Sequence, residues 1–359
     1  LFALAAGKLD PTGSERKRER DAGRALAGHA TLNRLEIAPE KLDPKRRDLK
    51  ILHSPEAFER LFVDLFLDAH ERPPEQIILD FDATDDRVHG SQEGRFYHGY
   101  YGHYCYLPLY VFCGDFLLCA KLRTADQDGA AGSLEELTRI VAHIREQWPE
   151  TRIVVRADSG FCRDWLMAWC EQADGVEFIL GLARNKRLTK QISEPLAERK
   201  KEVEAAGASS RSFHELRYRT KASWSCERRV VAKAEVLVGK ANPRFVVTSL
   251  SEEEIDAVTL YEHLYCARGE MENRIKEQQL GMFADRTSSQ TMRANQLRLW
   301  LSSLAYALVN ELRAVGLAGT ELARAQVWTI RTRLLKVGAL IRQSVRRVMI
   351  SMSSSFPLQ

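Results

Sequence analysis

The sequence predicts an α/β protein in which strands alternate with helices. Apolar runs of strand length alternate with longer segments of helical period, which is the pattern of this class. The chain has 359 residues, of which 45% are hydrophobic and 28% are charged. This balance is typical of a globular chain, and the length suggests two or three domains of roughly 150 residues each. Fibrous, collagenous and wholly disordered classes are therefore excluded.

The first predicted element is a helix, and strands follow it. Apolar residues spaced i, i+3, i+4, i+7 and i+8 from Phe58 to Phe66 predict an amphipathic helix over residues 56–70, which Pro73 and Pro74 end. Short apolar runs predict strands at residues 76–82, 152–157 and 176–182, and two more within 104–121, separated at Gly114 and Asp115.

Helices are predicted between and after these strands. Ser133-Leu134-Glu135-Glu136 has the pattern of a capping box and predicts a helix over residues 133–147. Another helix is expected over residues 161–172. Three segments between residues 213 and 249 alternate without helical period, which predicts an antiparallel β insertion. Helical spacing returns from residue 251, and a long apolar-faced helix is marked by Leu297, Trp300, Leu301, Leu304, Leu308 and Leu312.

Charge is unevenly distributed along the chain. The net charge is only +4, but residues 1–50 carry 12 basic and 8 acidic side chains, residues 51–285 carry 30 and 39, and residues 286–359 carry 11 and 2. Basic ends suit a polyanion, because each phosphate contact adds salt-dependent affinity. The alternative is an exposed arginine-rich surface without a partner. The C-terminal candidates are Arg331, Arg333, Lys336, Arg342, Arg346 and Arg347.

Several classes of protein and site are disfavoured. The longest stretch without charged residues, 96–114, contains two histidines, a proline and three glycines and is a poor membrane span. The seven cysteines form no C-x-x-C pair and no zinc spacing, so we expect buried thiols in a reducing cytoplasm. There is no P-loop and no G-x-S-x-G elbow. The absent initiator methionine suggests that an N-terminal segment is missing.

Two aspartates follow predicted strands. Asp80 and Asp82 lie on one face of the strand at residues 76–82, and the alternative is a strand-to-turn transition that also contains Asp85 and Asp86. Asp158 follows the strand at residues 152–157. Reactive groups gather at the carboxyl ends of strands in open α/β sheets, although a helix N-cap would also explain this aspartate.

A third acid lies on a predicted helix. Tyr265, Arg268, Glu272 and Lys276 share one helical stripe, which is either a solvated salt-bridge ladder or a grip for phosphate and metal. Phosphodiester chemistry commonly uses two Mg²⁺ about 4 Å apart. Mg²⁺ prefers oxygen ligands, including one or two carboxylates. Three carboxylates, two at strand ends and one on a helix, meet that requirement.

Three motifs, LDFDATDDRVHGSQEG, RIVVRADSGF and YCARGEMENRIKE, resemble those of the DDE transposases of bacterial insertion sequences, in the group of insertion sequence thirteen-eighty. The resemblance covers nearly the whole chain. It implies a ribonuclease-H-like, retroviral-integrase-like core, which is a mixed sheet flanked by helices, with an antiparallel β insertion between the second and third acids. The implied divisions are a basic arm or linker at 1–50, the first part of the core at 51–184, the insertion at 185–250, the last part of the core at 251–315 and a basic segment at 316–359.

The resemblance also implies a chemistry. Asp82, Asp158 and Glu272 match the family's metal-binding triad, for two Mg²⁺ ions with Mn²⁺ as the alternative, and Tyr265 and Arg268 match residues that hold DNA phosphate. The lysine of the family's signature, seven residues after the glutamate, is Gln279 here, and the nearest lysine is Lys276. Asp80, Asp85 and Asp86 are further candidates as helpers.

The implied activity is metal-dependent cleavage at element ends and strand transfer of the 3′-OH into target DNA. The expected partners are terminal inverted repeats, target DNA and a second copy of the chain, without a nucleotide cofactor or a membrane. The expected location is the bacterial cytoplasm, in association with the nucleoid. Arg342, Arg346 and Arg347 are expected to bind DNA. The rival functions are a nuclease without strand transfer and a catalytically silent DNA-binding remnant.

An aromatic block precedes and includes the predicted strands at 104–121. Such residues either stack on unpaired bases or pack in a half-buried sheet. We expect packing for the later tyrosines and leave both alternatives open for Tyr97 and Tyr100. The block comprises Phe96, Tyr97, Tyr100, Tyr101, Tyr104, Tyr106 and Tyr110.

Overall fold

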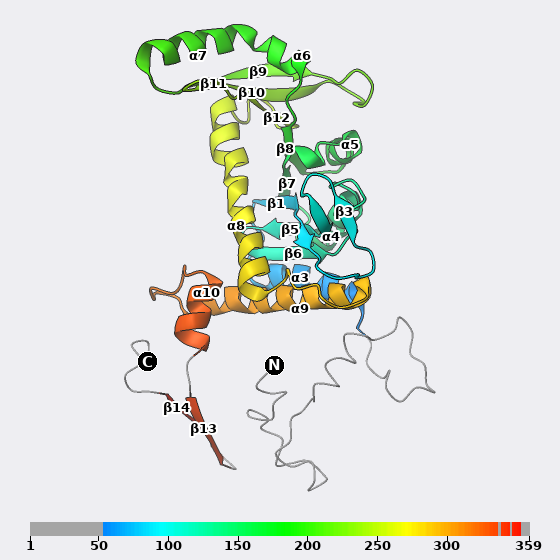
Figure 1. Cartoon of the computed structure of the whole chain (residues 1–359), viewed down its shortest axis with the longest axis vertical. Helices are drawn as coiled ribbons and strands as arrows, with labels where there is room; N and C mark the ends of the chain where they lie inside the picture. Colours follow the sequence, from blue (N-terminus) through cyan, green and yellow to red (C-terminus); the bar gives the residue numbers. More distant parts are fainter. Residues whose placement is uncertain (1–52, 337–338, 345–346, 353–359) are drawn as a thin grey trace. The chain divides into compact units, whose positions relative to one another are not determined.

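The computed structural model describes residues 53–336, 339–344 and 347–352 (Figure 1). The chain divides into two units. The first, which we call the sheet unit, comprises Glu56–Val88 and Gly94–Lys276. The second, which we call the C-terminal unit, includes His89–Glu93 and the described residues from Glu277 onward. Residues 1–52, the predicted basic arm, lie outside the described residues, as does Arg346.

The sheet unit contains a mixed sheet with strand order β11-β10-β12-β8-β7-β1-β5-β6, and β9 pairs with β10. Strands β1, β7 and β8 run parallel, whereas β5 and β12 run antiparallel to their neighbours β1 and β8. The strands are β1 (Gln76–Ala83), β5 (Leu109–Cys113), β6 (Phe116–Lys121), β7 (Arg152–Ala157), β8 (Val176–Leu182), β9 (Ser210–Tyr218), β10 (Arg228–Leu237), β11 (Lys240–Ala241) and β12 (Arg244–Thr248).

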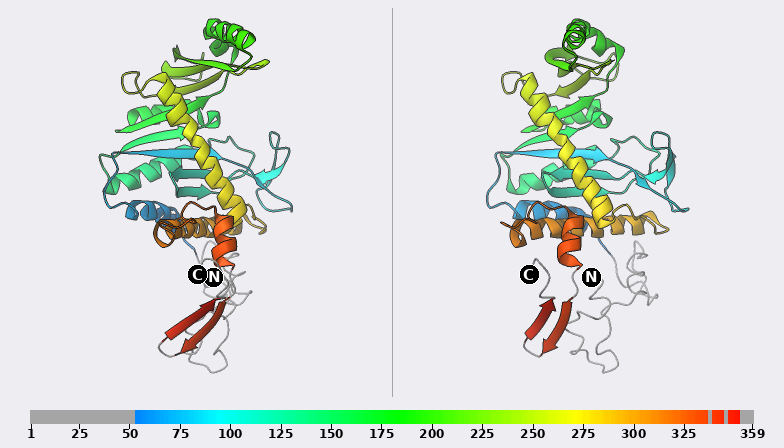
Figure 2. Two further views of the ribbon diagram at one scale, coloured as in Figure 1. Left: turned by 90° about the vertical axis from the view of Figure 1, so that its left-hand side faces the viewer. Right: turned by 60° about the vertical axis from the view of Figure 1, so that its left-hand side comes forward.

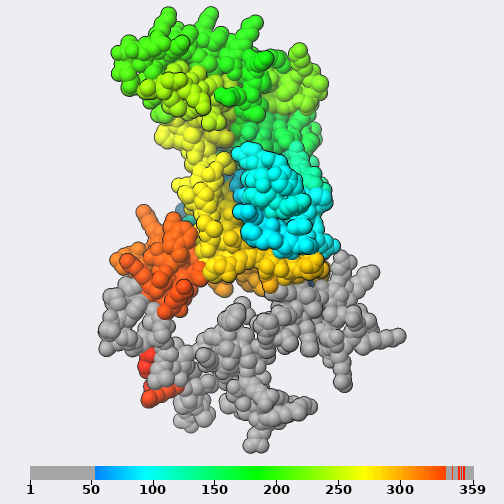
Figure 3. Space-filling model, in the orientation of Figure 1, coloured from blue at the N-terminus to red at the C-terminus, as the bar shows by residue number. Residues whose placement is uncertain are grey.

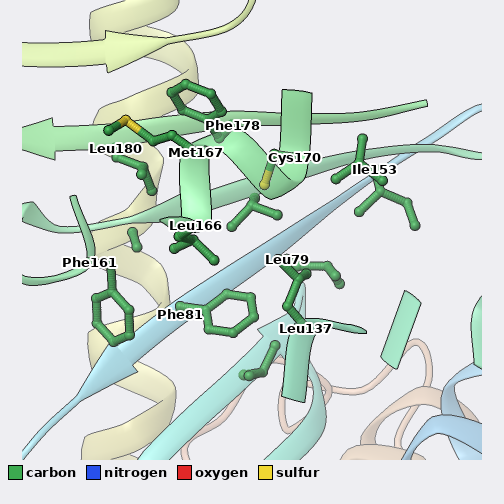
Figure 4. Packing of buried hydrophobic residues seen from close by; sticks show 14 of the residues in the cluster. Leu79, Phe81, Leu137, Ile153, Phe161, Leu166, Met167, Cys170, Phe178 and Leu180 are labelled. Atoms are coloured by element: carbon green, nitrogen blue, oxygen red, sulfur yellow. The ribbon is translucent and has the colours of Figure 1, made fainter. Parts of the chain in front are cut away.

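Helices cover both faces of this sheet, because side chains alternate along each strand and both faces are apolar. On one face, Leu79 and Phe81 of β1 pack with Leu137 and Leu166 from helices of that layer (Figure 4). The helices of this layer are α3 (Pro55–Asp68), α4 (Ser133–Gln147) and α5 (Asp164–Gln172). These elements confirm the α/β prediction for this part of the chain.

The opposite face is crossed by a long helical segment (Figure 2). Its π-helical start, η3 (Thr259–Tyr265), buries Leu260 and Tyr261 against Val154 and Ile179 of the sheet. A short 3₁₀ turn, η4 (Cys266–Arg268), and helix α8 (Gly269–Lys276) continue it. One helical segment is therefore held across the carboxyl ends of the parallel strands.

The prediction for residues 104–121 was wrong in one respect. The break at Gly114 and Asp115 is confirmed as the β5–β6 turn, but a second break falls at Pro108. Because proline has no N–H to donate to a ladder, the strand cannot continue through it. The preceding strand, β4 (His103–Tyr106), pairs with β2 (Asp86–Arg87) and β3 (Phe96–His98) in a separate small sheet. This small sheet forms part of the molecular surface, coloured cyan in Figure 3.

The tyrosines of the aromatic block divide between the core and the surface. Tyr106 and Tyr110 are fully buried, which confirms packing at these positions. Tyr97 and Tyr100 are 58% and 87% exposed, and Tyr104 is half exposed and stacks under the guanidinium of Arg95. Packing therefore does not account for Tyr97 and Tyr100.

Helix α4 has the predicted bounds, but its predicted capping box is wrong. Gly132 stands at the N-cap with φ of 74°, and the Ser133 hydroxyl donates to the carbonyl of Ala130. Glu136 does not reach back to the helix start. Its buried carboxylate accepts hydrogen bonds from Lys121 and Arg139, and these partners lower its pKa against the effect of burial.

Between Ser210 and Thr248 the strands β9, β10 and β12 pair antiparallel, as expected. Helices α6 (Lys186–Gln191) and α7 (Ser193–Ala206) precede them and were not predicted. These helices are highly charged and bury few apolar side chains, so their helical period is weak. The missed signal was Asn185, whose side chain caps α6 by accepting from the N–H groups of Arg187 and Leu188.

The C-terminal unit contains the predicted long helix as α9 (Met292–Glu311). Val309, Leu317, Val327 and Ile330 form part of a small core. The remaining elements are the π-helical turns η5 (Glu277–Gly281), η6 (Leu312–Gly316) and η7 (Arg331–Leu335), helix α10 (Val327–Ile330), and the paired strands β13 (Ala339–Ser344) and β14 (Arg347–Met352). Among the described residues, no helix is long and apolar enough to cross a membrane.

All seven cysteines are free thiols, but the prediction that they are buried holds only in part. Cys226 and Cys266 are exposed and Cys162 is half-buried. Cys226 lies in a loop and Cys266 lies in a helical turn, and neither residue belongs to an apolar pattern that would bury it.

Candidate active site

The two candidate aspartates lie side by side at one edge of the main sheet. Asp82 is near the carboxyl end of β1, and Asp158 directly follows β7. Strands β1 and β7 are parallel neighbours, with Phe81 opposite Ala157, so the next residue of each strand is an aspartate. The crevice at the carboxyl ends of such strands is where open α/β sheets place ligands.

Asp158 also caps a helical turn. Its Oδ1 accepts a hydrogen bond of 2.7 Å from the N–H of Gly160, at the start of the 3₁₀ turn η2 (Ser159–Phe161). A side chain at position 160 would meet this oxygen, because a Cβ there would lie only 2.9 Å from Oδ1. Asp158 is therefore an N-cap, but only of this 3₁₀ turn, because the helix predicted over residues 161–172 begins at Asp164, as α5. The cap fixes the direction in which the carboxylate points.

The helical segment across the sheet brings a third acid and an arginine to the pair. Arg268 Nη2 donates to Glu272 Oε1 at 2.8 Å, and Arg268 Nη1 lies 3.7 Å from Asp82 Oδ1. One guanidinium thus contacts two carboxylates that come from different elements. The salt-bridge alternative for this stripe is correct for Arg268 and Glu272, and the same contact ties the helix to β1.

The three carboxylates influence one another electrostatically. Burial raises the pKa of Asp82 to about 6 against the opposing charge of Arg268, and the charges of Asp158 and Glu272 contribute to the rise. Asp82 is 16% exposed, whereas Glu272 is 45% exposed. Burial lowers the pKa of Arg268, but the charges of Asp82 and Glu272 outweigh that effect and raise it. The site is an acidic cluster with one internal counter-charge.

Tyr265, at the end of η3, completes the group beside Arg268 and Asp158. Burial raises the pKa of its phenol, the nearby guanidinium of Arg268 opposes the rise, and the charge of Asp158 adds to it. The hydroxyl lies against β8 at Gly181, where an added Cβ would overlap it and would lie 2.9 Å from the N–H nitrogen of Ser159. Gly181 therefore leaves the space that seats the tyrosine next to Asp158.

This close approach gives a prediction. We expect Gly181→Ala to displace the Tyr265 hydroxyl and to destabilise the fold by about 1–3 kcal/mol, because overpacking a dense core costs that much. The measurement is the urea midpoint, together with the ultraviolet titration of tyrosine, which should show one phenol shifting toward its ordinary pKa. Gly129→Ala is the matched control, because a Cβ there meets nothing within 4 Å. Equal effects of the two substitutions would contradict the close contact between Gly181 and the Tyr265 hydroxyl.

The other aspartates of the first motif have partners of their own. Asp80 forms a buried bidentate pair with Arg156, at 2.5 Å to Nε and 2.7 Å to Nη2. Asp85 accepts from His103 at 2.7 Å. Asp80 lies on the same face as Asp82, as predicted, but its carboxylate is occupied by an arginine from the neighbouring strand.

The remaining candidate residues are basic side chains outside the acidic cluster's own contacts. Lys276 is exposed, one helical turn beyond Glu272. Arg342 and Arg347 are exposed on β13 and β14 of the C-terminal unit. Arg331 and Arg333 of that unit bind the carbonyl of Gly281 and the carboxylate of Glu321. The roles of the first three in DNA binding stay predictions.

The donors of the cluster have the chemistry of a magnesium site but are not gathered as one. In the described part of the chain, no three His, Cys, Asp or Glu side chains are close enough to hold a metal ion together. The guanidinium of Arg268 instead provides the positive charge between Asp82 and Glu272. Carboxylate oxygens are the ligands that Mg²⁺ takes, and half-exposed Glu272 has room to move.

Sequence reasoning missed three residues of this region. Arg156 and Gly181 position the site. Arg156 lies within the motif RIVVRADSGF, which assigns it no role, and Gly181 lies outside the three motifs. Tyr101 faces the first motif: burial raises its pKa to about 12, and the charges of Asp85 and Asp82 add to the rise. Its place in the aromatic block was seen, but its proximity to Asp82 depends on the fold of the small sheet.

Comparisons with known proteins identify the family of the chain. The family model described as "Transposase DDE domain group 1" matches residues 3–359. No curated protein matches the chain. Among solved structures, the chain is similar to a piggyBac transposase in a synaptic complex with hairpin DNA, with a TM-score of 0.41 and 12% sequence identity. The match covers 73% of this chain and 52% of that one, so the chain spans about half of that structure's length. The match of the family model over nearly its whole length shows that the chain belongs to the transposase DDE domain group 1 family.

Proposed function

We propose that the chain is the DNA transposase of a bacterial insertion sequence, in the group of insertion sequence thirteen-eighty. It would cut DNA at the ends of the element and join the freed 3′-OH to target DNA. The observation that carries the proposal is that Asp158 and Glu272 lie near enough to Asp82 for their charges to raise its pKa, with Arg268 in contact with both Asp82 and Glu272. Membership of the family supports the same activity.

The proposed core is ribonuclease-H-like, and the mixed sheet with helices on both faces supports it. Strands β9, β10 and β12 follow Asp158 and precede Glu272 in the chain, so we assign them to the β insertion. The domain boundaries at residues 50, 184, 250 and 315 are part of this proposal. We also propose that two copies of the chain act together, because transposition joins two element ends.

Each residue of the site has a proposed role. Asp82, Asp158 and Glu272 would hold two Mg²⁺ or Mn²⁺ ions, which supply activation of the attacking oxygen and neutralisation of the leaving one. Arg268, which now balances Asp82 and Glu272, and the Tyr265 hydroxyl would bind oxygens of the DNA phosphate beside the cleaved bond. Lys276, Arg342, Arg346 and Arg347 would contact other DNA phosphates.

A cleavage and strand-transfer experiment tests the proposal. The purified chain is incubated with a duplex that carries an element end, with Mg²⁺ or with a chelator, and in parallel with a pre-cut 3′-OH end and a supercoiled target. We expect metal-dependent nicking in the first reaction and joined products in the second. Nicking without joining would favour a nuclease without strand transfer. Salt-dependent binding without either reaction would favour a catalytically inactive, DNA-binding remnant.

A further inference from the structure

A pocket with basic side chains at its edge lies next to the acidic cluster in the sheet unit. It has a volume of about 310 Å³ and lies where β8 ends and β12 begins, beside η3. Its lining includes Arg184, Lys240 and Arg244, together with Ser159 and Tyr265 of the site. Ser159 directly follows Asp158, so the pocket and the acids are adjacent.

The three cations of this pocket are available to a ligand. Arg184, Lys240 and Arg244 are exposed, and none of them forms an ion pair or a side-chain hydrogen bond with another described residue. No aspartate or glutamate lines the pocket. Elsewhere in the sheet unit, arginines such as Arg228 and Arg229 are paired with carboxylates. Three unpaired cations around one hollow, without an acid, have the chemistry of an anion site.

Tyr265 links the pocket to the acids. Its ring lines the pocket, and its hydroxyl lies at Gly181, next to the N–H nitrogen of Ser159. The pocket also contains the buried ring of Tyr261, which gives an apolar wall next to the cations. A polyanion with one phosphate at the acidic cluster would therefore meet the positively charged pocket on the other side of the Tyr265 ring.

We propose that this pocket binds the phosphodiester backbone of the DNA strand whose neighbouring phosphate lies at the acidic cluster. This inference rests on the proposed function, because it takes the acids as the place where DNA is cut. Arginine and lysine bind phosphate oxygens by charge-assisted hydrogen bonds, and Arg184 and Arg244 offer planar donor groups for them. The DNA strand would thus run from the acidic cluster, past Tyr265, to the pocket.

DNA binding without cleavage tests the pocket. The triple variant Arg184→Ala, Lys240→Ala and Arg244→Ala is compared with the unaltered chain by fluorescence anisotropy, with a dye-labelled duplex of arbitrary sequence and a chelator, over a range of salt concentrations. Each lost phosphate contact lowers the slope of log Kd against log salt by about 0.9. We expect the slope to fall by about 2–3, with at least a tenfold loss of affinity at low salt.

The matched control removes the same charge elsewhere in the sheet unit. The control variant carries Arg72→Ala, Lys201→Ala and Lys221→Ala, which remove three exposed cations outside the pocket. We expect its slope to change by less than 1, because it loses only general electrostatic attraction to DNA. An unchanged slope in the pocket variant, or an equal fall in the control, would overturn the proposal. Full displacement of the duplex from the unaltered chain by a nucleoside monophosphate would also overturn it, in favour of a free-nucleotide site.

The result is separable from the fate of the proposed function. A smaller slope in the pocket variant, with no cleavage by the unaltered chain, would support DNA binding by the pocket and overturn the proposed cleavage activity. Cleavage by the unaltered chain, with identical slopes in all three proteins, would support the proposed cleavage activity and overturn DNA binding by the pocket. Matching circular dichroism spectra and melting temperatures exclude unfolding as the cause, since all three side chains are exposed.

Discussion

Replacing Asp82 by asparagine is expected to abolish DNA cleavage and, at the same time, to stabilise the metal-free protein at neutral pH. Asparagine keeps the shape of the side chain but removes a buried charge that the fold holds with its pKa raised to about 6. In the unfolded chain this carboxyl has an ordinary pKa of about 3.9. The difference between these two pKa values means that Asp82→Asn should raise the free energy of unfolding by about 3 kcal/mol at neutral pH.

The sign of this effect follows from proton linkage. The folded protein binds the Asp82 proton more tightly than the unfolded chain does, so its favourable contribution is complete below about pH 4 and is lost as the pH rises to about 6. Above pH 6 the charged aspartate weakens the fold, and asparagine does not. The measurement is the urea midpoint with a chelator at pH 7.5 and at pH 4. The variant should have the higher midpoint only at pH 7.5.

An exposed aspartate provides the control. Asp126 lies on a surface loop of the sheet unit, and Asp126→Asn should change neither the midpoint nor cleavage. A second comparison adds Mg²⁺, which should raise the midpoint of the unaltered chain more than that of Asp82→Asn, because a ligand stabilises the state that binds it. Retained cleavage in Asp82→Asn, or a lower midpoint at pH 7.5, would contradict the role given to Asp82.

Much of the site was predictable because its residues follow strong local patterns. Strand alternation placed Asp80 and Asp82 on one face, and the apolar run before Asp158 ended a parallel strand, as predicted. Helical spacing placed Arg268 and Glu272 within one turn, where they form an ion pair. These predictions depended on periods of 2 and 3.6 residues, and the spacing from Arg268 to Glu272 held although the segment begins with the π-helical η3 and the 3₁₀ turn η4.

The features that the sequence did not predict depend on contacts between segments that are distant in the chain. The partner of Asp80 is set by the register that puts Arg156 opposite it on β7, and a run of apolar residues does not reveal register. Gly181 looks like any strand glycine until Tyr265 is placed against it. The capping box at Ser133 failed because Lys121 and Arg139 attract the carboxylate of Glu136 more strongly than a backbone N–H does.

The second large effect is expected at the buried pair of Arg156 and Asp80, which are 6% and 5% exposed. Besides its two bonds to Asp80, Arg156 donates through Nη1 to the carbonyl of Leu264, the residue before Tyr265. One guanidinium thus connects β7, β1 and the helical segment that carries Glu272. We expect Arg156→Leu to lower the free energy of unfolding by about 3–5 kcal/mol, because it leaves the Asp80 charge buried and unpaired.

Stability and positioning can be separated by a second substitution. In the double variant Asp80→Leu and Arg156→Leu no charge remains buried, and replacing a buried pair by apolar residues is often neutral or stabilising, so most of the lost stability should return. The bond to the Leu264 carbonyl does not return, so cleavage should stay low although the protein is folded. Urea midpoints and cleavage rates of the single and double variants test this separation.

A control on the same strand shows whether any lost arginine would have the same effect. Arg152 pairs with Glu177 and Glu254 at the surface and is 36% exposed, so Arg152→Leu should cost about 1 kcal/mol or less and leave cleavage unchanged. If the double variant regained both stability and cleavage, Arg156 would serve only to neutralise Asp80. If it regained stability alone, the bond to Leu264 would be what holds Tyr265, Arg268 and Glu272 over the two aspartates.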